Sequence, residues 1–591
     1  MEPKTPAFLG VEKSFSGKRW QSRVSDDRQA LALAQRLGIA EILARILVGR
    51  GIALDQASWF LDPTLRDSLP NPSQFKDMDR AAERLAAAIM GGERICIFGD
   101  YDVDGATSSA VLTRFIAAAG GKTFFYIPDR LTEGYGPNTP ALQGIKAQGA
   151  SLVLTADCGI TAFEPIRAAR DMGLDLIVVD HHEAEPSLPE AFAVINPNRL
   201  DESGAYGQLA AVGVAFLLCV ATNRVLRDAG WYVERNEPDL MSLLDLVALG
   251  TICDVVPLVG LNRALARQGL KVMARRGNVG LAALSEVANI DKAPDAYHAG
   301  FVFGPRINAG GRVGEAALGA RLLTTDSMTE ARTIARTLDG LNRERQAVEA
   351  AVLEAATALV GKGRPGRKVI VVASAGWHPG VIGIVASRLK DRYDLPAFVI
   401  SLDGETGKGS GRSIPSVDLG AIVIAARQAG LLVNGGGHRM AAGLTIEREK
   451  VSDFEAFLDE RLQDRGDVTP ILNLDAALSV GGANFELVQK VQDLGPFGAG
   501  NAEPRLAIAD ATIAYADIVG ENHVRCTLQG NDGKKLKGIS FRSADQAWGQ
   551  ALLSSGGRPL HIAGHLRLDS WQGHNRVQLV ITDAAAAGGG R

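Results

Sequence analysis

The sequence contains few cysteines, and those present are scattered. Five occur among 591 residues, and no two of them form a CxxC pair. Disulfide frameworks and zinc knuckles need cysteines at short, recurring spacings, so neither is expected here. We therefore expect a protein of a reducing compartment, the cytoplasm.

Long apolar runs and a strong net charge are also missing. No stretch holds the roughly 18 uninterrupted apolar residues of a membrane-spanning helix, and residues 1–20 contain no apolar core of signal-peptide length. We expect no membrane span and no contact with a membrane. The net charge of −4 gives no general attraction to nucleic acid. A site for a polyanion must therefore come from local clusters of Lys and Arg.

The length favours three or four domains, and the apolar pattern changes along the chain. We expect a helical leader over 1–70, an α/β domain over 71–320, a connecting helix over 321–365, a smaller α/β domain over 366–462, an all-β barrel over 463–584, and a disordered tail over 585–591. The Gly/Pro/basic segment GKGRPGRK indicates the boundary before the second α/β domain.

Two patterns of apolar residues support this division into domains. The runs RICIF, TFFYI, SLVLT, LDLIVV and AFAVI are too short for helices and lack alternating polarity. They are typical of a parallel sheet that is covered on both faces. Near the C-terminus, HVRCTLQ, KKLKGISFR, LHIAGHLRLD and RVQLVITD alternate apolar and polar residues. Several such short strands within about 110 residues favour a small closed barrel.

Acidic and imidazole side chains follow three successive predicted strands. They are Asp100, Asp102 and Asp104 after RICIF, Asp157 after SLVLT, and Asp180, His181 and His182 after LIVV. Asp254, in the apolar segment ALGTICDVVPL, is a fourth candidate. A single aspartate after a strand is most often a helix cap or a turn residue. Recurrence at three strand ends is an improbable coincidence, and in a parallel sheet these ends meet at one edge.

A cluster of carboxylates needs cations to offset its mutual repulsion. Carboxylate oxygens with one or two imidazoles suit Mn²⁺ or Mg²⁺, and the absence of a cysteine ligand disfavours zinc. Four or more acids indicate two ions, about 3.5–4 Å apart in sites of this kind.

The motifs GDYDVDG, ADCGIT, VVDHHE and ALGTICDVVPL resemble those of the DHH phosphoesterase superfamily. With FGPRINAGGR and NGGGHRMAAG, their order resembles that of its single-strand-specific 5′→3′ exonucleases, from about residue 75 to the C-terminus. The resemblance implies two metal ions, with ligands at Asp102, Asp104, Asp157, His181 and Asp254 and with Asp157 bridging. It also implies a catalytic group of Asp157, Asp180 and His182.

Two details of the implied site stay open. Many smaller DHH phosphatases have a histidine four residues before the first Asp of DxD, where this chain has Phe98. Asp100 is our candidate for the missing ligand. His182 either orients a ligand, or donates to the scissile phosphate, or packs beneath the metal loop.

Three glycine-rich segments, GPRINAGGR, GKGSGR and NGGGHRMAAG, are candidates for holding substrate. We expect GPRINAGGR and GKGSGR to be loops, since glycine-rich loops present backbone N–H groups to phosphate. The candidate residues are Arg306, Asn308, Arg312, Ser410, Arg412, Gly437, His438, Arg439 and, after a strand of the first sheet, Arg130. Solvated surface arginines are the plainer interpretation. The resemblance implies that Arg130, Ser410 and Arg412 form a pocket for a 5′-terminal phosphate.

The predicted barrel resembles an OB-fold, which holds single strands through a basic groove and base stacking. Its candidate contacts are Lys534, Lys535, Lys537, Phe541, Arg542, Arg567, Trp571, His574 and Arg576. A barrel core with a solvated polar face would give a similar pattern.

The leading hypothesis is a two-metal 5′→3′ exonuclease that degrades single-stranded DNA to nucleoside monophosphates in recombination and repair. Its substrate would be 5′-phosphorylated single-stranded DNA, with a helicase and a single-strand binding protein as partners, and we expect a monomer. Hydrolysis of short oligonucleotides or cyclic dinucleotides is a second hypothesis, disfavoured by the C-terminal barrel. A non-catalytic DNA-binding scaffold is a third, disfavoured by the complete set of candidate ligands.

Overall fold

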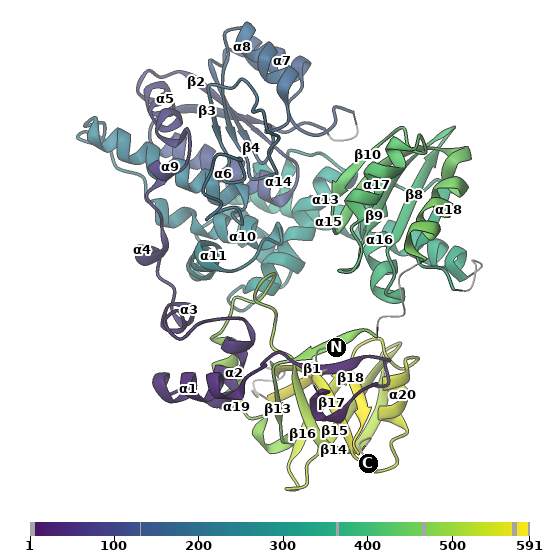
Figure 1. Cartoon of the computed structure of the whole chain (residues 1–591). Helices are drawn as coiled ribbons and strands as arrows, with labels where there is room; N and C mark the ends of the chain where they lie inside the picture. The colour runs from purple at the N-terminus through teal and green to yellow at the C-terminus, as the bar shows by residue number, and fades with distance from the viewer. Residues whose placement is uncertain (1–5, 130–131, 362–365, 464–468, 570–575, 589–591) are drawn as a thin grey trace. The chain divides into compact units, whose positions relative to one another are not determined.

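The computed structural model describes the chain except residues 1–5, 130–131, 362–365, 464–468, 570–575 and 589–591 (Figure 1). It divides into two compact units. The barrel unit comprises Met1–Asn71, Val255–Lys271 and Thr469–Arg591, and the two-sheet unit comprises Pro72–Asp254 and Val272–Val468. Among the helices in the described ranges, none is long and apolar enough to cross a membrane.

The first sheet of the two-sheet unit is parallel throughout, with strand order β3-β2-β4-β5-β6. The strands are β2 Arg94–Gly99, β3 Lys122–Tyr126, β4 Leu152–Ala156, β5 Asp175–Val179 and β6 Ala193–Ile195. All five predicted strands are therefore confirmed. Helices α7 (Thr139–Ala147) and α8 (Phe163–Asp171) bury one face. Helices α5 (Met78–Met90), α6 (Val103–Ala118) and α9 (Ala211–Asp228) lie on the other (Figure 1).

A helical part follows the first sheet. It includes α10 Leu244–Cys253, α12 Val279–Val287, a π-helix His298–Phe303, α13 Gly304–Val313, α14 Leu318–Thr324 and the 34-residue α15 Met328–Gly361. The intervening helix α11 Gly260–Met273 lies mainly in the barrel unit. The predicted long connecting helix is thus present as α15.

The segment that we predicted as a glycine-rich loop around Arg306 and Arg312 is the helix α13, so that prediction was wrong. Pro305 stands in the first turn, where its fixed φ suits a helix start. Gly311 serves close packing, because a Cβ there would lie 1.9 Å from Cδ2 of Tyr101. Gly311 therefore reflects close contact between α13 and the side chain of Tyr101, and it does not mark a loop.

The second sheet has the order β10-β11-β9-β8-β7. Strands β7 Ile370–Ala375 and β8 Ala397–Asp403 pair in parallel, and β9 Thr406–Arg412, β10 Asn434–His438 and β11 Ala441–Glu447 add antiparallel pairs. Helices α16 Pro379–Tyr393, α17 Leu419–Gln428 and α18 Val451–Leu462 complete this domain.

The segment GKGSGR, also predicted as a loop, is the central strand β9, so that prediction was wrong too. Side chains from neighbouring strands occupy the space beside its glycines. A Cβ on Gly409 would lie 2.6 Å from Leu444, and one on Gly411 would lie 2.4 Å from Phe398. Because side chains alternate along a strand, the residues between these glycines face the opposite side of the sheet.

The barrel predicted near the C-terminus is confirmed. Its strands are β14 Leu506–Val519, β15 His523–Gln529, β16 Lys535–Ser540, β17 Leu560–Asp569 and β18 Arg576–Ala586. They close because β14 pairs with β15 on one side and with β17 on the other. A short strand, β13 (Ala476–Leu478), adds to β14 in parallel.

The N-terminal segment belongs to the barrel unit. Its helices α1 (Asp27–Leu37) and α2 (Glu41–Gly49) bury apolar residues in the core that the barrel strands supply. It also holds a strand, β1 (Arg19–Ser22), which pairs in parallel with β12 (Ile471–Leu474). Fully buried Trp20 donates from Nε1 to Asp583 at 2.9 Å, so contacts distant in sequence fix this strand.

Candidate metal centre and phosphate pocket

The first sheet brings three strand ends together at one edge. Strand β2 leads into Asp100, β4 into Asp157, and β5 into Asp180, and β4 lies between the other two strands. The backbone of Asp157 has φ 65°, a left-handed turn that ends the strand sharply. The parallel topology therefore produces the convergence that the sequence predicted.

Three groups of side chains at this edge have the geometry of a metal site. Within each group the ligand atoms lie within 4.8 Å of one another; the groups are Asp100–Asp102–Asp157, Asp104–His181–Asp254 and Asp157–His181–His182. Asp157 and His181 each belong to two groups. Of the two, only the carboxylate has two ligand oxygens with which to bridge a pair of ions. All six predicted metal ligands thus lie in these groups, together with His182.

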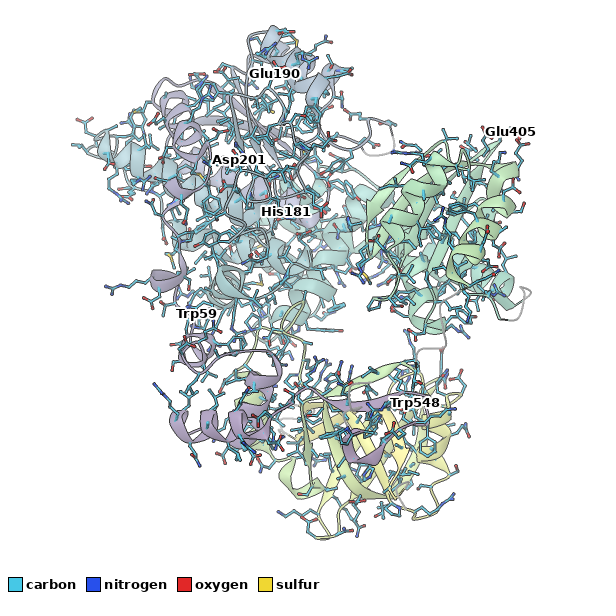
Figure 2. All side chains as sticks on the ribbon, in the orientation of Figure 1. Trp59, His181, Glu190, Asp201, Glu405 and Trp548 are labelled. Carbon is cyan, nitrogen blue, oxygen red and sulfur yellow. The ribbon has the colours of Figure 1, made fainter. Side chains whose placement is uncertain are left out.

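His181, labelled in Figure 2, is oriented for metal binding. Its Nδ1 donates a hydrogen bond to the carbonyl oxygen of Leu209 at 3.0 Å, and burial lowers the pKa of the ring. The neutral ring thus carries its proton on Nδ1 and leaves Nε2 free for a metal ion. That Nε2 lies 3.4 Å from Oδ1 of Asp157, 3.6 Å from Oδ2 of Asp254 and 3.9 Å from Oδ2 of Asp104. One bare nitrogen therefore faces three carboxylates.

Two of the aspartates also have the capping role that we weighed against metal binding. Asp102 accepts a hydrogen bond from Gly105 N at 3.0 Å and caps α6. Asp104 accepts from Ala211 N and Val212 N, at 2.7 and 2.9 Å, in the first turn of α9. Capping and metal binding are compatible here, because each carboxylate oxygen has more than one lone pair.

Asp180 is placed differently from the other aspartates. It is fully buried, and Oδ1 accepts from the backbone N of His181 and His182 while Oδ2 accepts from Ile160 N at 3.0 Å. Nδ1 of His182 lies 2.7 Å from the same Oδ1. Burial raises the pKa of Asp180, but the hydrogen bond from His182 and its charge, with the N–H of Ile160 and the charge of His181, together outweigh burial, and the pKa lies below its usual value. Asp180 therefore fixes the two histidines.

The electrostatics of the cluster fit divalent cations. Burial first, and then Asp102, Asp104 and Asp100, raise the pKa of Asp157 well above its usual range. Burial and Asp102 raise that of Asp254 to about 7. Within the described residues, Oδ1 of Asp157 and Oδ2 of Asp254 are buried without a hydrogen-bond partner. Oxygens of this kind, with imidazole nitrogen, are ligands for Mn²⁺ or Mg²⁺.

Sequence reasoning missed one residue at the metal edge, Tyr135. Its hydroxyl donates to the carbonyl oxygen of Asp157 at 3.0 Å and lies 3.5 Å from Nδ1 of His182. The side chain comes from the segment between β3 and α7, and 51% of the residue is exposed. The signal available was EGYG (133–136), a turn sequence in the segment that follows β3 of the same sheet.

A polar cavity of about 450 Å³ lies beside α13, α16 and the second sheet. Its lining includes Arg312, Lys408, Ser410 and Arg412, so the alternate residues of β9 do share one face. Glycines 435 and 436 of β10 line it as well. Sequence reasoning missed further lining residues, namely Tyr101, Pro379, Gly380, Ile382, Gly383, Asn434 and Thr445. The dipeptide Pro379–Gly380 at the start of α16 was an available helix-start signal.

The remaining substrate candidates lie outside this lining. Arg306 donates from Nε to Asp339 at 3.0 Å, and Oδ1 of Asn308 is buried without a partner among the described residues. Gly437 adopts φ 148° at the end of β10, His438 is exposed, and Arg439 donates to Pro415 O at 2.8 Å. Arg130 lies outside the described residues.

The barrel carries its own candidate surface. A second cavity is lined by Ala514, Tyr515, Thr527, Lys535 and Lys537. Of the other predicted contacts, Lys534, Phe541, Arg542 and Arg576 are exposed, and Arg567 pairs with Glu503 at 2.7 Å. Trp571 and His574 lie outside the described residues. An aromatic ring beside two lysines has the composition of a single-strand groove.

Comparisons with known proteins agree with this architecture. Family models match in three places: the DHH family N-terminal domain over 94–251, the DHHA1 domain over 366–464, and the RecJ OB domain over 474–583. The single-stranded-DNA-specific exonuclease RecJ of Bacillus subtilis (strain 168) is 35% identical over 580 residues, which cover 97% of this chain and 71% of that protein.

Solved structures give the same answer. RecJ from Thermus thermophilus in complex with Mn²⁺ superposes with a TM-score of 0.80 at 30% identity, covering 96% of this chain and 78% of that one. The complex with Mg²⁺ gives a TM-score of 0.73 at 28% identity, with the same coverage. Since matched relatives above 30% identity cover nearly the whole chain, this protein belongs to the RecJ family of single-stranded-DNA-specific exonucleases, in the DHH superfamily.

Proposed function

We propose that this protein is a metal-dependent 5′→3′ exonuclease that degrades single-stranded DNA to nucleoside monophosphates, in recombination and repair. The observation that carries the proposal is the cluster of carboxylates and imidazoles at the ends of β2, β4 and β5, in a chain of the RecJ family. When bound there, two Mn²⁺ or Mg²⁺ ions would supply an activated water and stabilise charge on the phosphoryl group.

The chain's own residues would hold the ions and orient the substrate. Asp100, Asp102 and Asp157 form one ligand group, and Asp104, His181 and Asp254 form another. Asp180 holds His182 beside the cluster. Burial lowers the pKa of His182, but Asp180, and after it Asp254 and Asp104, together raise it to about 9. A protonated His182 would donate a hydrogen bond to the scissile phosphate.

Polarity requires a group that recognises one end of the strand. A 5′-terminal phosphate carries about −1.5 to −2 charges, more than an internal phosphodiester. Arg312, Lys408, Ser410 and Arg412 line one cavity, and arginine offers planar, bidentate contacts to phosphate. We assign this cavity to the 5′-phosphate. We assign the barrel surface with Tyr515, Lys535 and Lys537 to single-strand contacts of its own.

The test is digestion of a 5′-labelled single strand, with 3′-labelled and hairpin controls, each with and without Mn²⁺. The expected result is release of labelled mononucleotide from the 5′-labelled strand at the earliest times, only with the metal, and no digestion of a blunt hairpin. Early release from the 3′ label, or equal attack on the hairpin, would contradict the proposal.

A further inference from the structure

The cavity is bordered by α16, which packs on the long helix α15 through an apolar cluster that includes Val352 and Val385. A buried carboxylate, Glu349, adds a polar link between the two helices. Glu349 of α15 is 8% exposed. Its Oε1 accepts a hydrogen bond from Nε of Arg388, on α16, at 3.3 Å. Its Oε2 accepts from Arg345, one turn earlier on α15, at 2.5 Å. The carboxylate thus engages both helices.

Arg345 depends on this carboxylate. It is also 8% exposed, and its Nε and Nη2 donate to the side-chain oxygen of Asn342 at 3.3 and 3.0 Å. Burial lowers the pKa of Arg345, and the charge of Glu349 opposes that shift. Since an unpaired buried charge is strongly destabilising, Glu349 is what allows a guanidinium at this position.

The negative charge of Glu349 also acts on Arg312, which lines the cavity. Burial lowers the pKa of Arg312, whereas Asp102 and Glu349 act to raise it. Burial and the neighbouring Arg312 lower the pKa of Arg412. The two cavity arginines therefore repel each other, and Glu349 offsets part of the excess positive charge.

The backbone of α16 lies against both arginines. Arg312 donates from Nη1 to the carbonyl oxygen of Gly380, in the first turn of α16, at 2.7 Å. A Cβ on Gly383, one turn further on, would lie 3.0 Å from Nη2 of Arg412 and 3.1 Å from Oγ of Ser410. The helix backbone is thus in contact with the side chains that line the cavity, and a shift of α16 would move them.

We propose that Glu349 is a positioning residue for this phosphate cavity: it adds a polar link to the apolar contact between α15 and α16 and balances the charge of the arginines, so that Arg312 and Arg412 meet a DNA phosphate in a fixed geometry. Glu349 does not line the cavity. The inference rests on the proposed function and adds a residue outside the metal and phosphate groups.

The test is Glu349→Gln, which keeps the size of the side chain and removes its charge. By charge alone, loss of an acid beside an anion site would tighten DNA binding. Positioning predicts the opposite: KM for a 5′-phosphorylated single strand rises about tenfold while kcat stays within about twofold, the signature of lost binding. The dissociation constant of the same oligonucleotide, measured by fluorescence anisotropy in EDTA, should rise in parallel.

A matched control is Glu286→Gln. Glu286, on α12, forms an ion pair with Arg332 of α15 at 2.8 Å, so the control breaks a helix–helix ion pair with the same change of charge. It is not part of the cavity lining. KM for this variant should equal that of the wild type.

An unchanged or lower KM for Glu349→Gln would overturn the inference. If that variant does not fold, the double variant Glu349→Leu, Arg345→Met replaces the buried pair with apolar side chains of similar volume, a change that is often neutral. The double variant should show the same rise in KM. A KM equal to that of the wild type would again overturn the inference. A wild-type protein inactive on single strands would instead defeat the proposed function, and the anisotropy comparison would still decide the role of Glu349.

Discussion

Nδ1 of His182 lies 2.7 Å from Oδ1 of Asp180, a carboxylate with no exposed surface. The same oxygen accepts two backbone hydrogen bonds, and Oδ2 accepts a third. An amide cannot accept at both ends, so Asp180→Asn would leave at least one buried donor unpaired and release His182. We expect kcat to fall about 10–100-fold, the usual effect of losing a group that orients a metal site. Steady-state kinetics with Mn²⁺ measure it.

The control for this prediction is Asp175→Asn, at the other end of the same strand. Asp175 is partly exposed and pairs with Arg84 at 2.7 Å. Its variant should keep kcat within about twofold of wild type, since exposed ion pairs contribute little. Equal kcat for wild type and Asp180→Asn would reject the orienting role.

Asp157 should show opposite effects on activity and on metal-free stability. Its variant Asp157→Asn, or Asp157→Ala, loses the shared ligand and should abolish cleavage. In EDTA, however, the variant should unfold at a higher temperature, because burial and three or more neighbouring carboxylates disfavour the charged side chain. Near-normal turnover of the variant with added Mn²⁺ would reject the two-metal arrangement.

Asp100 is the candidate for the ligand that Phe98 does not supply. Phe98 is fully buried and stacks on Tyr126 at 5.4 Å, so it faces the core. Asp100 instead joins Asp102 and Asp157 in one ligand group. Asp100→Ala should therefore raise the Mn²⁺ concentration needed for half-maximal activity about tenfold. Asp129→Ala, after β3 of the same sheet, should leave the Mn²⁺ titration unchanged; an unchanged titration for Asp100→Ala would make it a turn residue.

The metal edge could be predicted from the sequence because its logic is local. A buried strand followed by an acid is visible in the chain, and parallel pairing then brings Asp100, Asp157 and Asp180 together without further information. Helix α13 and strand β9 could not be predicted in this way. Their glycines leave room for Tyr101 and Leu444, whose side chains come from distant parts of the sequence. The glycine-rich composition therefore resembles that of a loop, although the segments form a helix and a strand.

The substrate residues show the same limit. The cavity wall is formed by the alternate residues Lys408, Ser410 and Arg412. Their spacing predicts a shared face only once β9 is known to be a strand. Tyr135 was missed because its place at the metal edge rests on a hydroxyl 3.0 Å from the carbonyl oxygen of Asp157, a contact no local pattern encodes.

Asp245 should make stability depend on pH. It is buried on α10, and burial raises its pKa to about 6 although Leu246 N donates to it at 2.7 Å. A raised pKa means that the folded state holds the proton more tightly than the unfolded state. The stabilisation is complete below about pH 4 and is lost as the pH rises through 6, a difference of up to about 3 kcal/mol.

Asp245→Asn removes this dependence, since the amide does not titrate. Relative to wild type, its free energy of unfolding should be higher at pH 8 than at pH 4.5, by about 1–3 kcal/mol. Urea unfolding of the metal-free proteins at both pH values gives the difference. Asp239→Asn, an exposed cap of a 3₁₀ turn, is the control and should show none. An equal shift in both variants would remove Asp245 as the cause.

Arg412 tests whether the cavity recognises the 5′ end. Its Nη1 donates to Oγ of Ser410 at 3.0 Å, which aims the guanidinium along the cavity wall. A charge-assisted hydrogen bond contributes about 1.5–3 kcal/mol, so Arg412→Ala should lower kcat/KM about 10–100-fold on 5′-phosphorylated strands and much less on matched 5′-hydroxyl strands. Lys537→Ala, in the barrel cavity, is the control. Lys537 would contact internal phosphates, so its loss should weaken the binding of both substrates alike and reduce the salt dependence of that binding. An equal loss on both substrates for Arg412→Ala would make it a general backbone contact, and polarity would then have to come from another group.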